Sequence, residues 1–145
     1  AFDLQEALSF EGETGPYVQY AAVRARNILR KLAERGETLP EFTAALPADA
    51  MARQLGEESF WQLLLAASKS GQALGAALET GEPAAMAKYA FQLAQAFNAF
   101  YHDSPILAEE NPEKRTFLLW LAVYFKEQLE ATLERTLGIP VPDYM

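Results

Sequence analysis

The sequence contains no cysteine, only one histidine (His102) and no glycine-rich phosphate loop. The lack of cysteine excludes disulfides, thiolate metal sites and cysteine nucleophiles. Any Ser/His/Asp arrangement would have to use the single histidine, and no such set stands out among the serines and acids. We expect His102 to be a loop residue that hydrogen-bonds its neighbours. These absences predict a chain with no catalytic residues of its own.

The sequence also lacks a long apolar run. The longest one, FLLWLAVYF at 117–125, is much shorter than the ~20 residues that cross a bilayer. No basic segment followed by an apolar one near the start resembles a secretory signal. Half of the 145 residues are hydrophobic, which is enough for one domain with its own core.

Basic residues are scarce outside one segment. The formal net charge is −8, which argues against non-specific binding to polyanions. Residues 17–35, however, contain five bases and one acid, a net charge of +4, whereas the rest of the chain carries a net charge of −12. The acids at 109, 110 and 113 are expected to form a solvated loop and helix start rather than a metal site. The sequence thus predicts one basic helix in an acidic body.

Helix-start and helix-stop signals predict an all-α fold, a helical bundle of four main helices plus short helices. The helices are expected at 16–35, 59–78, 83–100 and 112–137, with Pro16 at the first helical position and Asn111 as an N-cap. Gly36 and Gly138 are placed to end two of them. Prolines 40 and 47 bound a loop-rich stretch with room for a short helix. Trp61 and Trp120 lie in apolar runs and are expected in the core.

The first helix carries two stripes. At 100° per residue, an apolar stripe includes Val18, Ala22, Ala25, Leu29 and Leu32, and is the expected core face. A second stripe, about 100–160° away, includes Tyr17, Tyr20, Arg24, Lys31 and Arg35. Tyrosines often border a core, but rings followed by cations also suit a groove for single-stranded nucleic acid. The pattern alone leaves both interpretations open.

Three separated motifs resemble one family. The segment FDLQEALSFEGETGPYVQYAAVRARNIL at 2–29 resembles the part of arginyl-tRNA synthetases that joins the catalytic domain to the helical, DALR-type anticodon-binding domain. YAFQLAQAFNAFYHDSPIL at 89–107 resembles that family's FN-x-FY helix and following loop. LERTLGIPVPDYM at 133–145 resembles its C-terminal ending. The resemblance covers essentially the whole chain, although residues 37–58 carry no motif.

The resemblance implies a tRNA-binding domain that recognises the anticodon loop of arginine tRNA. Residues 1–15 would be a linker from a catalytic domain, and 16–145 the anticodon-binding domain. The parent would be a cytoplasmic arginine–tRNA ligase that uses ATP and Mg²⁺ in its catalytic domain, whereas this part has no cofactor. The resemblance implies that the catalytic domain carries the class I motif of the HIGH type, which needs two histidines. This chain has one histidine, so the motif is absent here. The expected tRNA-binding residues are Tyr17, Tyr20, Arg24, Lys31, Phe97, Tyr101 and Met145.

The sequence departs from the family pattern at one position. Ala22 stands where the family usually has histidine, but this position lies on the expected core stripe and concerns packing more than recognition. The acidic body also suits an alternative function, a free-standing helical protein-interaction domain that keeps the fold and no longer binds tRNA.

Overall fold

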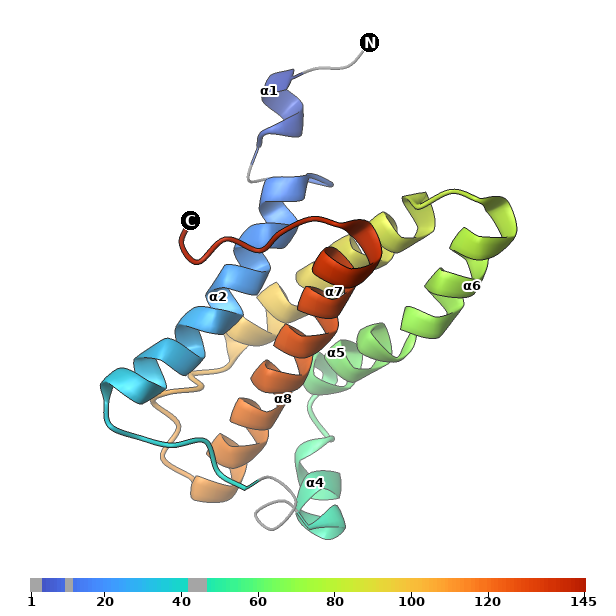
Figure 1. The fold of residues 1–145 in the computed structure, drawn as a ribbon. Helices are drawn as coiled ribbons and strands as arrows, with labels where there is room; N and C mark the ends of the chain where they lie inside the picture. The colour runs from blue at the N-terminus through green and yellow to red at the C-terminus, as the bar shows by residue number, and fades with distance from the viewer. Residues whose placement is uncertain (1–3, 10–11, 42–46) are drawn as a thin grey trace.

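The computed structural model describes residues 4–9, 12–41 and 47–145, and in these ranges it contains helices and no strand (Figure 1). The predicted all-α class is confirmed. The helices are α1 Leu4–Ala7, α2 Gly15–Glu34, α4 Ala48–Gln54, α5 Glu58–Ser68, α6 Ser70–Thr80, α7 Ala84–Asp103, α8 Pro112–Glu130 and the π-helix η1 Ala131–Leu137. The short helix expected between the two prolines falls on 42–46, outside the described residues.

Helix α2 begins and ends close to where the sequence predicts. The Thr14 hydroxyl oxygen accepts a hydrogen bond of 3.3 Å from the backbone N–H of Tyr17, and Pro16 lies in the first turn. Gly36 follows the helix with φ of +71°, a conformation that favours glycine. Helix α8 begins in the same way, because the Asn111 side chain accepts a 3.0 Å bond from the N–H of Lys114.

Helices α2, α7 and α8 pack against one another and share the core (Figure 1). Leu93 and Phe125 are fully buried, as predicted. Leu29 was expected beside them, but it is only half-buried, and Ile28 takes its place at 3% exposed. The other four residues of the predicted stripe are buried, so the prediction is wrong at Leu29 alone. Its buried residues are Val18, Ala21, Ala22, Val23, Ala25, Ile28 and Leu32.

The single helix predicted at 59–78 is two helices, α5 and α6, separated at Lys69. The Ser68 hydroxyl donates to the carbonyl of Leu65, and the N–H of Lys69 bonds to the carbonyl of Ala66, so the last turn tightens and the axis breaks. The N-cap residue of α5 is Glu57.

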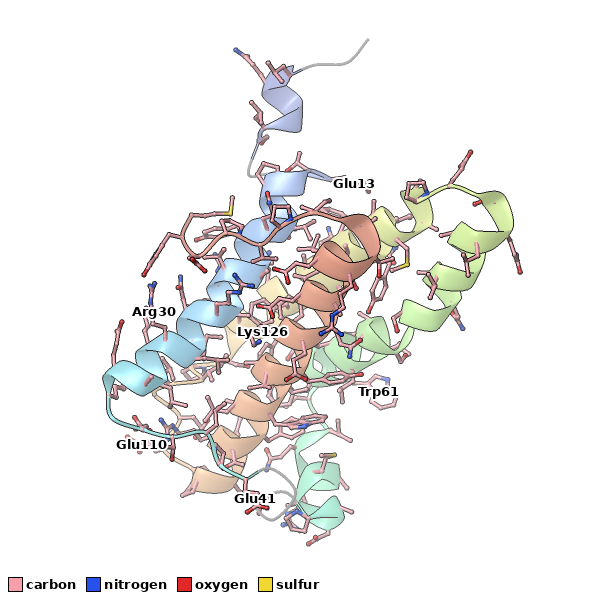
Figure 2. The ribbon with its side chains drawn as sticks, in the orientation of Figure 1. Glu13, Arg30, Glu41, Trp61, Glu110 and Lys126 are labelled. Atoms are coloured by element: carbon pink, nitrogen blue, oxygen red, sulfur yellow. The ribbon has the colours of Figure 1, made fainter. Side chains whose placement is uncertain are left out.

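The expectation that Trp61 lies in the core is wrong. Its side chain is 50% exposed and projects away from the bundle (Figure 2). The buried positions of α5 are Phe60, Leu63 and Ala67, which are spaced i, i+3, i+7 on one face of the helix. Trp61, the residue after Phe60, therefore faces outward. Trp120 is partly buried and packs against the core.

Glu113, at the start of α8, is bonded to two side chains of α4. The Glu113 carboxylate accepts hydrogen bonds from Arg53 (3.0 Å) and Gln54 (3.1 Å), which joins α4 to the start of α8. Hydrogen bonding to Arg53 lowers the pKa of this carboxyl.

Among the helices in the described ranges, none is both long enough and apolar enough for a membrane span.

Candidate nucleic-acid interface

A cleft of about 570 Å³ lies between the outer face of α2 and the end of α7. Tyr20, Arg24 and Lys31 line it from α2, and Tyr101 lines it from α7. The loop that leaves α7, residues 104–108, closes one side, and Ile28 reaches it from the core face of α2. Because residues 20, 24 and 31 fall within about 40° of one another around the helix, one face of α2 supplies all three side chains.

Arg24 is held between two tyrosine rings. Its guanidinium carbon lies 4.7 Å from the ring centroid of Tyr20 and 4.9 Å from that of Tyr101, within the range of cation–π attraction. Nη1 of Arg24 donates a 3.0 Å hydrogen bond to Oδ1 of Asn98 on α7. Nδ2 of Asn98 in turn donates a 2.9 Å bond to the hydroxyl of Tyr17. The guanidinium is therefore fixed in orientation, with donors remaining for a ligand.

The cleft collects positive charge that is not neutralised nearby. Arg26 and Arg30 on α2 pair with acids, Arg26 with Glu130 at 2.6 Å and Arg30 with Glu34 at 3.7 Å. Within the described part of the chain, the three cations Arg24, Lys31 and Arg35 have no carboxylate within 4.0 Å. Arg35 instead donates a 2.8 Å bond to the carbonyl of Leu107 in the loop at the cleft.

A different environment surrounds Arg26 on the other side of α2. Burial opposes its charge, but the hydrogen bond to Glu130 and the charges of Glu130, Glu134 and Asp143 outweigh that effect and raise the pKa of the guanidinium. Arg26 is thus an internal ion-pair partner, and the α2 cations that line the cleft are Arg24 and Lys31. The basic helix predicted from composition divides into a paired side and an unpaired side.

A family model with the description "DALR anticodon binding domain" matches residues 18–145. The chain belongs to this family. The similar proteins include the "Arginine--tRNA ligase" of Hyphomonas neptunium, 41% identical over 144 residues, which cover 99% of this chain and 22% of that protein. The protein of the same description from Agathobacter rectalis is 38% identical over 144 residues, with 99% of this chain and 23% of that protein covered.

A solved structure is also similar to this DALR domain. The Thermus thermophilus arginyl-tRNA synthetase superposes with a TM-score of 0.76 at 34% sequence identity, over 99% of this chain and 23% of that one. The chain therefore spans less than a quarter of the length of the relatives that it matches. The resemblance read from the three motifs is confirmed.

Four of the predicted site residues of the DALR domain lie together at the cleft, namely Tyr20, Arg24, Lys31 and Tyr101. Tyr17 lies behind them, half-buried, with its ring 5.2 Å from that of Phe91. Met145 is 46% exposed on the C-terminal tail and is not among the described residues that line the cleft.

Phe97 does not form a wall of the cleft, contrary to the expectation from the sequence. Its side chain is fully buried and stacks on Phe125 with ring centroids 3.8 Å apart. Phe97 also lies 6.0 Å from the ring of Tyr101, centroid to centroid, so it supports the residue that reaches the surface. A base cannot stack on Phe97 without displacing the core.

Sequence reasoning missed two residues and misplaced a third. Asn98 orients Arg24, but its own position on α7 gives no signal of this role, because the contact joins residues 74 apart in the chain. Asn27 lines the cleft one turn after Arg24 and could have been found from the helical period. His102, expected in a loop, lies in the last turn of α7 and lines the cleft.

Proposed function

We propose that this DALR domain binds the anticodon loop of arginine tRNA in the cleft between α2 and α7. It would serve as the anticodon-binding part of an arginine–tRNA ligase, for arginyl-tRNA aminoacylation in translation. The single observation that carries this proposal is the position of Arg24 between the rings of Tyr20 and Tyr101 at the cleft. Tyrosine rings and a guanidinium plane are the groups on which unpaired RNA bases stack.

The charge and size of the cleft support the proposal. Arg24, Lys31 and Arg35 provide local positive charge for phosphates, although the whole chain is acidic. A volume of about 570 Å³ falls in the usual range for a small ligand, which suits one or a few splayed nucleotides. All arginine codons have G in the middle, so the complementary anticodon base is C, and one cleft for this base would serve every arginine tRNA.

The proposal assigns recognition to this domain and chemistry to the rest of the parent protein. The catalytic domain of the same chain would hold ATP, Mg²⁺ and arginine. We expect weak binding by the domain alone, because its acidic remainder repels RNA and the parent's other domains would hold the rest of the tRNA.

A binding titration tests the proposal. Fluorescence anisotropy at low salt would compare arginine tRNA with the wild-type domain, Tyr20→Ala and Tyr20→Phe. Loss of an aromatic stack costs ~1–3 kcal/mol, so Tyr20→Ala should bind about 5- to 150-fold more weakly, with an unchanged salt dependence. Tyr20→Phe keeps the ring and should bind nearly as wild type. If folded Tyr20→Ala binds as tightly as wild type, Tyr20 is merely at the edge of the core and a protein-interaction role gains support.

A further inference from the structure

The C-terminal tail, residues 139–145, is held across α2 at a defined place (Figure 1). Gly138 turns the chain out of η1 with φ of +68°. Nε2 of Gln19 then donates a 2.8 Å hydrogen bond to the carbonyl of Pro140, and Nη1 of Arg26 donates a 2.9 Å bond to the carbonyl of Val141. The Val141 side chain is buried, at 7% exposed. The tail is therefore fixed to the bundle as far as Val141, three residues before Tyr144.

Arg26 is the anchor of this arrangement. Its Nε lies 2.6 Å from Oε1 of Glu130, and its Nη2 lies 3.3 Å from Oε1 of Glu134. Two carboxylates from α8 and η1 thus fix the plane of the guanidinium, and the remaining nitrogen binds the tail. Such fork geometry gives a fixed direction that a lysine would not provide.

Docking of the tail places Tyr144 beside Arg30. The guanidinium carbon of Arg30 lies 4.8 Å from the ring centroid of Tyr144, and the ring remains 74% exposed. Arg30 projects outward from α2 on the side toward which the C-terminal tail runs (Figures 1 and 2). The ion pair of Arg30 with Glu34 is long, at 3.7 Å, and exposed, so it constrains the guanidinium weakly.

Asn27 lies between the cleft and a second, smaller hollow. It lines the cleft with Tyr20 and Arg24, and it also lines a hollow of about 210 Å³ with Arg30 and Tyr144. Two tyrosine–arginine pairs thus lie on either side of Asn27, one made by Tyr20 and Arg24 of α2 and the other by Arg30 of α2 and Tyr144 of the tail. Arg26 and Asp143 line the second hollow as well. Since Arg26 is already paired with Glu130 and Glu134, Asp143 offsets the charge of Arg30, which favours a neutral base over a phosphate.

We propose that Tyr144 and Arg30 form a second stacking site, which takes a nucleotide of the same RNA loop next to the one at Tyr20. This inference rests on the proposed function, because it assumes an RNA loop at the cleft. Bases stack on tyrosine whatever their identity, and the arginine plane adds to the platform. Since the tail is already docked, little ordering cost opposes the use of Tyr144.

The test uses the anticodon stem-loop of an arginine tRNA with wild type, Tyr144→Ala, Tyr144→Phe and Tyr20→Ala. Tyr144→Ala should weaken binding about 5- to 150-fold without changing the salt dependence, whereas Tyr144→Phe should bind as wild type. Because Tyr144 is exposed, the thermal unfolding midpoint should not change, which excludes a folding defect.

Abasic substitutions, one at each loop position, then locate the stacked nucleotide. At one loop position, the abasic substitution should weaken binding by wild type but should not weaken binding by Tyr144→Ala any further. A different loop position should show the same pattern with Tyr20→Ala. The inference is overturned if Tyr144→Ala binds as wild type while Tyr20→Ala is impaired, or if no position couples to Tyr144. If wild type does not bind the stem-loop, or Tyr20→Ala has no effect, the proposed function itself fails.

Discussion

Arg24 on α2 and Asn98 on α7 are joined by a 3.0 Å hydrogen bond from Nη1 to Oδ1, and this bond sets the direction in which the guanidinium faces the cleft. The ring centroids of Tyr20 and Tyr101 lie 4.7 and 4.9 Å from its central carbon. A guanidinium held on three sides is pre-organised, so less entropy is lost when it binds a ligand. From the position of Arg24 we expect that another cation would not replace arginine at this point of α2.

Substitution of Arg24 tests this requirement. Arg24→Lys keeps the charge, but an ammonium cannot lie flat between two rings, so it should recover only part of the affinity lost in Arg24→Ala. If Arg24 contacts a phosphate, Arg24→Ala should also reduce the log–log salt slope by about 0.7. Titrations of arginine tRNA at several salt concentrations measure both effects. Equal affinities of Arg24→Lys and wild type would contradict a role for the guanidinium plane.

Removal of a core side chain should destabilise the bundle. Leu93 is fully buried between the main helices, so Leu93→Ala should cost ~2–5 kcal/mol of unfolding free energy. Leu78, which is 75% exposed on α6, provides the matched control, and Leu78→Ala should change stability by about 0.5 kcal/mol or less. Urea unfolding measures both. An unchanged midpoint for Leu93→Ala would mean that α7 is placed wrongly.

Tyr89 should make the fold sensitive to high pH. Burial raises the pKa of its hydroxyl from 10.0 to about 12, and the hydroxyl bonds to the carbonyl of Ala67 at 3.1 Å. A pKa raised in the folded state gives stability that is complete below pH 10 and is lost as the pH rises toward 12. Urea unfolding over this range should show a smaller pH dependence for Tyr89→Phe, which cannot ionise, than for wild type. Identical slopes would refute the shift.

The chain by itself should not activate arginine. It has one histidine and no glycine-rich phosphate loop, and binding of an anticodon loop does not form an adenylate. Arginine-dependent exchange of pyrophosphate into ATP should therefore be undetectable with a clean preparation. Reproducible exchange, at a rate proportional to the concentration of this chain, would show that a nucleotide site has been overlooked.

The helical period of the sequence predicted much of α2. It placed Tyr20, Arg24 and Lys31 on one face, because residues three, four and seven apart recur on the same side of a helix. It placed the core register less well, since Ile28 and Leu29 are equally apolar neighbours and only packing decides which is buried. The same ambiguity explains Trp61, which lies beside the buried Phe60.

The sequence pattern could not predict contacts between distant segments of the chain. Phe97 and Tyr101 lie one turn apart on α7, yet Phe125 covers the first and leaves the second at the cleft. Arg26 gave no sign from composition that it would bind a tail 115 residues later. Such contacts depend on how the helices dock against one another, and local periodicity does not contain this information.

Replacement of the middle anticodon base measures the central claim most directly. An arginine anticodon stem-loop and the same stem-loop with its middle C changed would be titrated with the wild-type domain under one salt condition. The account predicts at least about fivefold weaker binding of the changed loop, as the loss of a base-edge hydrogen bond worth about 1 kcal/mol implies, and a smaller difference for Arg24→Ala. Equal affinity of the wild-type domain for both loops would contradict recognition of the anticodon by this cleft.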